Sequence, residues 1–290
     1  MSEKSSRVNR TNVMATLPPM RVWLLHVGGN AALLGLAYLW LWLPDAKLWQ
    51  LAASAALALF VLAAALWVHG ATLAFLDSAH RGAEESLVRA FRSTLPRLPA
   101  LFAWLVLVLA ALWLLKRFDT LLAGWAAPTA SWLTLKLQKP VHPQTIANGF
   151  ATFIWVLMWF AVPLTFLPCA LQVSRSGLAA FGWSRVRCVW RSFWRMRYWL
   201  GYVVVFVVGA YLPYRIAAWA PKVSGLGLEG TSAAVRFVLA YLLAICGWLA
   251  LLSLVAKFAD QNGIAPTSTP ASTAGVPGPS PSVSLGGTRQ

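Results

Sequence analysis

The amino-acid sequence predicts an all-α membrane protein with six transmembrane helices. Of its 290 residues, 59% are hydrophobic and only 11% are charged, and the mean hydropathy is +0.65. A soluble globular chain is about 45–50% apolar, so this composition is too apolar for one. The charged residues also lie between long runs that contain none. This distribution is typical of membrane helices, because an ionised group is costly in hydrocarbon.

Six apolar runs are long enough to cross about 30 Å of hydrocarbon at 1.5 Å per residue. Each run carries tryptophan or tyrosine near at least one end, where these rings favour the level of the lipid headgroups. We expect a membrane domain at residues 21–258, with spans at residues 22–43, 49–76, 98–115, 147–171, 198–214 and 233–256.

The two terminal segments differ in composition from this domain. Residues 1–20 are polar and basic and have no apolar face, and residues 261–290 are rich in Pro, Ser, Thr and Gly. Such segments cannot bury enough apolar surface to offset the entropy lost on ordering. We therefore expect a disordered N-terminus and a disordered C-terminal tail.

Basic residues are unevenly divided between the two sides that six spans define. Sixteen of the 24 Lys and Arg residues fall on the side of both termini and of the second and fourth connections, and eight fall on the other side. The positive-inside rule then places both termini in the cytoplasm. Arginine outnumbers lysine, and Ala, Leu and Trp are abundant. This bias indicates a GC-rich bacterial genome and hence a bacterial inner (plasma) membrane.

Residues 120–137 are nearly apolar enough for a seventh span. A crossing there would place the six arginines of the fourth connection outside the cell, against the positive-inside rule. Pro128, Trp125 and Trp132 also suit a segment near the membrane surface. We therefore expect an interfacial or re-entrant segment at these residues.

The two cytoplasmic connections each predict an interfacial amphipathic helix, and their sequences resemble each other. Ser86-Leu87-Val88-Arg89 corresponds to Ser184-Arg185-Val186-Arg187, and Arg92-Ser93 corresponds to Arg191-Ser192 with one residue inserted. Each connection joins an inward span to an outward span. The match therefore suggests an internal duplication with a symmetry axis along the membrane normal. Because few residues match, this duplication is a hypothesis that competes with chance similarity.

The fourth connection holds the densest cluster of arginine and tryptophan. Its arginines recur at four-residue steps, and its tryptophans lie on the adjacent helical face. Such a helix would lie in the headgroup plane, with guanidinium groups on phosphates and indole rings at the acyl boundary. A simpler interpretation is that these residues enforce topology and cap the fifth span. The candidates for binding anionic lipid or a protein partner are Arg187, Arg191, Arg195, Trp190, Trp194, Arg89 and Arg92.

Polar and helix-breaking residues inside the spans are few. His26 and Asn30 lie four residues apart on one face of the first span. They predict either a contact with a substrate or a hydrogen bond to a neighbouring helix. Pro163 and Pro168 each lack a backbone donor and predict a kink in the fourth span. Such a kink can open a cavity, or it can serve helix packing alone.

No sequence pattern predicts an enzyme, a metal site or a cofactor. His69, His80 and Glu84 follow one another from the cytoplasmic end of the second span, but they supply too few ligands for a metal. We find no pair of catalytic carboxylates, no nucleophile elbow and no phosphate-binding loop. Nucleic acid is also not an expected partner, because basic residues beside membrane spans account for the net charge of +16.

The sequence thus favours a non-enzymatic membrane scaffold or accessory subunit that engages anionic lipid or a protein partner through its cytoplasmic Arg/Trp helices. The alternative is a permease for a small or lipid-like solute, with a path near the proline kink and the face of His26 and Asn30. Coupled carriers and membrane enzymes generally need ionisable groups at depth. The spans carry none away from their ends, which favours the scaffold.

Overall fold

The computed structural model is all-helical over the residues that it describes, which are 18–44, 46–83, 85–182, 195–221 and 225–260. It contains six segments that are long and apolar enough to cross a membrane. They are Met20–Trp40, Leu48–His80, Leu87–Leu137, Pro143–Phe181, Met196–Ala218 and Gly227–Phe258. The prediction of six long apolar helices is therefore confirmed, and these helices indicate a multi-pass membrane protein.

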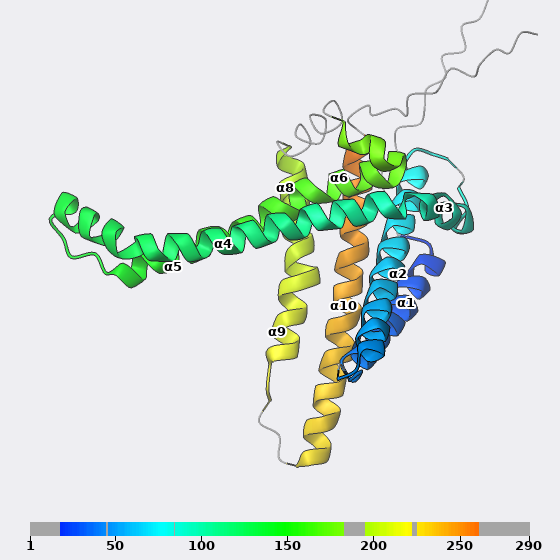
Figure 1. Ribbon diagram of the computed structural model, residues 1–290, viewed down its shortest axis with the longest axis horizontal. Coiled ribbons are helices and arrows are strands. Elements are labelled where there is room, and N and C mark those ends of the chain that lie inside the picture. Colours follow the sequence, from blue (N-terminus) through cyan, green and yellow to red (C-terminus); the bar gives the residue numbers. More distant parts are fainter. Residues whose placement is uncertain (1–17, 45, 84, 183–194, 222–224, 261–290) are drawn as a thin grey trace, which may run out of the picture.

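Four of these segments run side by side as a bundle (Figure 1). They are α1 (Met20–Trp40), α2 (Leu48–His80), α10 (Leu226–Asp260) and a segment made of α8 (Met196–Phe206), the π-helical turn η4 (Val207–Tyr211) and α9 (Leu212–Ala218). Val22 of α1 packs against Leu249 of α10. The Tyr198 ring of α8 lies 5.5 Å from the Phe258 ring of α10. The start of α1, the start of α8 and the end of α10 thus share one end of the bundle. We call it the linker end.

The other two segments form a hairpin that runs crosswise to the bundle (Figure 1). Its outgoing arm is α4 (Leu98–Leu137), whose 40 residues span ~60 Å. Its returning arm is α5 (Pro143–Val156), the π-helical turn η2 (Leu157–Ala161) and α6 (Val162–Ser176), followed by η3 (Gly177–Phe181). At the turn, Gln138 has a φ of 53°, and the backbone N–H of Val141 donates to Thr134 Oγ1 at 2.9 Å.

The prediction of a break between a third span at residues 98–115 and a segment at residues 120–137 is wrong, whereas the interfacial or re-entrant placement of residues 120–137 stays a prediction. These residues continue the third apolar helix without a break, so α4 ends at Leu137 and not near residue 115. Charged residues lie within this helix, where Lys116 Nζ is 3.0 Å from Asp119 Oδ2. Leucine and alanine continue on both sides of this pair, and both residues favour a helix.

The connection between the second and third spans forms a short helix, α3 (Leu87–Thr94), followed by η1 (Leu95–Arg97). Ser86 precedes α3 and caps it, because its Oγ accepts a hydrogen bond from the backbone N–H of Arg89 at 3.3 Å. The predicted helix in this linker is therefore present, while its place at a membrane surface stays a prediction. The second linker helix and both terminal tails fall on residues 183–194, 1–17 and 261–290, outside the described residues. The proposed duplication depends on that second linker and stays a hypothesis.

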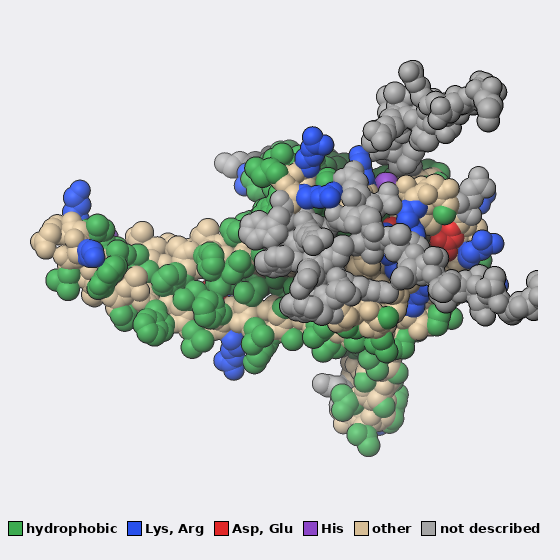
Figure 2. Space-filling model, turned by 90° about the horizontal axis from the view of Figure 1, so that it is seen from above, with side chains coloured by type: hydrophobic (Ala, Val, Ile, Leu, Met, Phe, Trp, Pro, Cys, Tyr) green, Lys and Arg blue, Asp and Glu red, His purple; other side chains and the backbone are tan. Residues whose placement is uncertain are grey.

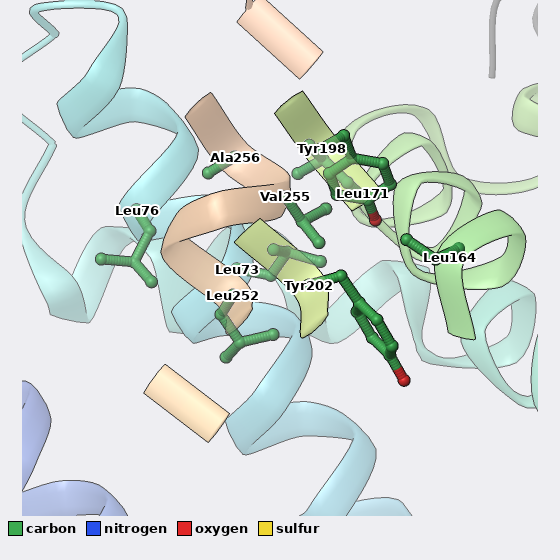
Figure 3. Close-up of a cluster of buried hydrophobic side chains, with 9 residues drawn as sticks. All are labelled: Leu73, Leu76, Leu164, Leu171, Tyr198, Tyr202, Leu252, Val255 and Ala256. Carbon is green, nitrogen blue, oxygen red and sulfur yellow. The ribbon is translucent and has the colours of Figure 1, made fainter. Parts of the chain in front are cut away.

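The largest cluster of buried hydrophobic side chains lies near the linker end and joins α2, α6, α8 and α10 (Figure 3). It consists of Leu73, Leu76, Leu164, Leu171, Tyr198, Tyr202, Leu252, Val255 and Ala256. Further along, η4 meets α10 backbone to backbone. A Cβ atom added to Gly209 would lie 2.5 Å from the Cα atom of Gly247. The two glycines thus allow the fifth and sixth spans to approach more closely than any side chain would permit.

Candidate functional site

An apolar cavity of about 510 Å³ lies where the crosswise hairpin meets the bundle. This volume falls within the roughly 300–1,000 Å³ that is typical of small-molecule sites. Its wall combines side chains from α4, η2, α6, the α8–η4 segment and α10. Large aromatic rings dominate the wall, among them Trp104, Trp159, Phe166, Phe206 and Trp248.

Pro163 and the π-helical turn before it shape this cavity. Pro163 has no N–H, so the carbonyl of Trp159, four residues earlier, lacks its usual helical donor. Tyr202 of α8 supplies a donor instead, because its hydroxyl donates to the Trp159 carbonyl oxygen at 2.5 Å. The same arrangement of a π turn followed by proline recurs at η4 and Pro213. A π turn thus precedes Pro163, while the kink predicted in this span stays a prediction.

The two predicted prolines differ in their relation to the cavity. Pro163 is part of its wall, whereas Pro168 is buried inside α6 and lies outside the wall. Sequence alone treats the two positions alike. The difference arises from the packing of α6 against the bundle.

Tyr202→Phe is expected to lower the free energy of unfolding by about 1–3 kcal/mol, because it leaves a partly buried carbonyl without a donor. Thermal unfolding in detergent micelles measures the change. Tyr214→Phe is the matched control, since Tyr214 is 68% exposed and should tolerate the change within about 0.5 kcal/mol. Equal effects of the two substitutions would show that the hydroxyl of Tyr202 contributes nothing to the fold.

His26 and Asn30 form a chain of hydrogen bonds toward α2. Asn30 Nδ2 donates to His26 Nδ1 at 3.2 Å, which leaves the proton of the ring on Nε2. This Nε2–H donates to Thr72 Oγ1 at 2.9 Å, and the Thr72 hydroxyl donates to the Val68 carbonyl at 2.8 Å. These contacts favour the helix-packing interpretation of His26 and Asn30.

His69 extends this polar layer toward the cavity. Its ring centroid lies 5.2 Å from that of His26, and its Nδ1 accepts a hydrogen bond from Trp248 Nε1 at 2.9 Å. Trp248 therefore donates its indole N–H to His69, and its ring forms part of the cavity wall. In the part of the chain that the structure describes, no group of three or more His, Cys, Asp or Glu side chains could hold a metal ion.

A buried charge cluster connects α2 with α6 at the linker end. Asp77 accepts hydrogen bonds from Arg81 Nη2 at 2.8 Å and from Arg175 Nε at 2.7 Å, and Arg175 Nη2 donates to its other oxygen. The Asp77 side chain is 1% exposed and that of Arg175 is 13% exposed. Arg97 adds a hydrogen bond to the carbonyl of Ser174, near the end of α6, where helix carbonyls lack intrahelical donors. The sequence analysis missed Asp77, although a lone carboxylate in the last turn of an apolar helix is a signal that could have identified it.

Other arginines at the linker end face outward. Arg89 and Arg92 are exposed on α3, and Arg197 is exposed in the first turn of α8. Figure 2 looks onto this end and shows Lys and Arg side chains distributed around it, with few Asp or Glu side chains among them.

The remaining predicted lipid- or partner-binding residues belong to the second linker. Arg195 is the residue that precedes α8 and is partly buried. Arg187, Arg191, Trp190 and Trp194 lie outside the described residues. The structure therefore places Arg89 and Arg92 at the linker end and leaves the role of the second group a prediction.

Comparison with known proteins identifies no relative of this chain. The chain matches no protein-family model, and neither a curated protein nor a solved structure is detectably similar to it. Its function is therefore inferred from its own residues and their contacts.

Proposed function

We propose that this protein is a non-enzymatic membrane scaffold or accessory subunit that binds anionic lipid headgroups at its linker end. The observation that carries this proposal is the exposure of Arg89 and Arg92 on α3, at an end of the bundle where arginine is abundant. Asp77 does not neutralise them, because it is buried and already bonded to Arg81 and Arg175. A basic surface beside membrane spans attracts anionic headgroups by about 1 kcal/mol per Lys or Arg.

The contacts of α3 support a defined position for these two arginines. Ala90 and Thr94 are fully buried on the face of α3 opposite to the solvent. Trp67 Nε1 of α2 donates to the carbonyl of Phe91 at 2.9 Å, and the two rings pack edge to face. A helix held in this way loses little freedom when its exposed side chains bind a ligand.

The orientation and location belong to the same proposal. With the linker end in the cytoplasm, the abundant arginines of the second and fourth connections obey the positive-inside rule. We propose that both termini lie there, in the inner membrane of a bacterium. A cytoplasmic or membrane protein that docks on the same basic surface is compatible with a role as an accessory subunit.

The double variant Arg89→Gln/Arg92→Gln tests the headgroup site. Loss of two surface arginines is expected to cost about 2 kcal/mol, or a roughly 30-fold weaker preference for phosphatidylglycerol over phosphatidylcholine. The measurement is competition between the two lipids for protein in mixed micelles, followed by mass spectrometry of the intact protein–lipid complexes. Arg117→Gln/Arg215→Gln is the matched control, because both residues are exposed and lie away from the linker end. An unchanged preference in the first double variant would contradict the proposal.

A permease for a lipid-like solute is the second candidate, favoured by the cavity and by the two π turns beside it. π turns interrupt the regular hydrogen bonding of a helix and are frequent at functional sites. Reconstituted vesicles that contain fluorescent lipid distinguish the candidates. A scaffold leaves the rate of lipid movement between leaflets at that of protein-free vesicles, whereas a permease for lipid-like solutes raises it.

A further inference from the structure

We infer that the cavity holds one acyl chain of a membrane glycerophospholipid, with the polar part of that lipid directed toward the linker end. The inference rests on the proposed function for the anionic character of the headgroup. The occupancy of the cavity by a chain is argued independently, from the cavity wall and from a polar group next to it.

Most of the cavity wall cannot form hydrogen bonds with a ligand. Four lining side chains carry an N–H or O–H donor, and two of these donors are already engaged, because the hydroxyl of Tyr202 donates to the Trp159 carbonyl and Trp248 Nε1 donates to His69. The other two donors are the indole N–H groups of Trp104 and Trp159, and the remaining lining side chains are aliphatic or phenyl groups, apart from the thioether of Met158. A polar solute would replace few of its hydrogen bonds to water here, and burial of an unpaired polar group is unfavourable. The fitting occupant is therefore an apolar chain.

The cavity is long enough for part of an acyl chain. On α10 it extends from Ala244 to Leu251, and on the α8–η4 segment from Tyr202 to Ala210. At 1.5 Å per residue each of these stretches covers about 10 Å along the helix axis. The wall also extends crosswise along the hairpin, from Trp104 to Leu112 on α4 and from Met158 to Ala170 on the returning arm. A chain beside α10 and the α8–η4 segment would run along the bundle axis, as the tail of a bilayer lipid does.

A buried polar group lies next to the cavity, on the side of the linker end. Tyr198 is one helical turn from the wall residue Tyr202 on α8, and Figure 3 shows both rings on the side of α8 that faces α6. Tyr198 is fully buried, and its hydroxyl has no hydrogen-bond partner among the described residues. A donor at this level matches an acceptor oxygen of a glycerol ester.

Arg197 completes the sequence of contacts from tail to headgroup. It adjoins Tyr198 in the chain and is exposed in the first turn of α8. The apolar cavity, the buried Tyr198 hydroxyl and the exposed Arg197 thus follow one another along α8 in the order of chain, ester and phosphate in an anionic phospholipid. A guanidinium group is well suited to phosphate.

The test uses the full-length protein in nanodiscs that contain phosphatidylglycerol with a photoreactive diazirine on its acyl chain. Irradiation followed by peptide mass spectrometry is expected to label residues of the cavity wall that are shielded from the surrounding lipid, such as Tyr202 and Phe206. Ala244→Phe should reduce this labelling at least fivefold, because the new ring fills the cavity. Ala234→Phe, on the exposed face of the same helix, is the matched control and should leave the labelling unchanged.

A second variant, Ala210→Leu, adds less volume from the opposite wall and should reduce the labelling about twofold if Ala244→Phe does not fold. Labelling of the wild-type protein that is spread evenly over lipid-exposed helix faces would overturn the inference, because an ordinary annular lipid produces that pattern. A strong preference for phosphatidylglycerol without cavity labelling would leave the proposed function standing and reject the acyl-chain site. Equal labelling of the cavity by a phosphatidylcholine probe would support the acyl-chain site and reject the anionic headgroup.

Discussion

Asp77→Asn is expected to destabilise the protein by about 3–5 kcal/mol, the largest effect of any single substitution considered for this chain. Asp77 is 1% exposed and compensates Arg175, which is only 13% exposed. Removing the carboxylate charge leaves this guanidinium group in a poorly solvated place without its counter-ion. Unfolding of the purified protein by titration with a denaturing detergent measures the loss.

Asp119→Asn is the control for Asp77→Asn. Asp119 pairs with Lys116, but the two side chains are 26% and 72% exposed, and solvated pairs contribute at most about 1 kcal/mol. A similar small effect at both aspartates would mean that the Asp77 cluster contributes no more than a surface ion pair. The comparison of the two aspartates tests a long-range contact, because Asp77 and Arg175 join α2 to α6 and are 98 residues apart in sequence.

The double variant Asp77→Leu/Arg175→Met separates the cost of an unpaired charge from the contribution of the pair. Apolar replacement of a buried ion pair is often neutral or stabilising, so most of the stability lost in Asp77→Asn should return. A double variant as unstable as Asp77→Asn would instead show that the bidentate geometry itself holds α6 against α2.

The helices of this chain could be predicted from the sequence because their signal is local. A run of about 20 apolar residues has to be helical in a bilayer, where every backbone polar group needs an internal partner. Helical periodicity in the same way placed a linker helix near Leu87. Sequence reasoning failed at residues 120–137, where a separate segment was expected and the third helix instead continues to Leu137. Lys116 and Asp119 neutralise each other three residues apart, which keeps the helix intact.

The candidate site depends on contacts between distant parts of the chain, which one sequence does not contain. His26 and Asn30 were recognised as polar, but their partner Thr72 and the neighbouring His69 come from another helix. The cavity needs the crossing of α4 and α6 with the bundle, and hydropathy gives no crossing angle. Asp77 drew no prediction from the sequence, because its long-range partner, Arg175, is remote in sequence.

Gly247→Ala is expected to lower stability by ~3 kcal/mol, at the upper end of the usual cost of overpacking. Its new methyl group would meet the backbone of Gly209, and backbone cannot move aside as the end of a flexible side chain can. Gly230→Ala on the same helix has no heavy atom within 4 Å of the added Cβ atom. It should therefore be neutral or gain up to about 1 kcal/mol from the higher helix propensity of alanine.

The same pair of glycines also sets the width of the cavity, because Gly209 and Gly247 both belong to its wall. Separation of η4 from α10 by a methyl group should change the shape of the cavity and lower acyl-chain labelling along with stability. Thermal unfolding and labelling of Gly247→Ala and Gly230→Ala, measured side by side, test both effects. If Gly247→Ala were as stable as Gly230→Ala, the close approach of these two helices would not exist in the folded protein. Retained stability with reduced labelling is not expected, since both effects arise from the same backbone contact.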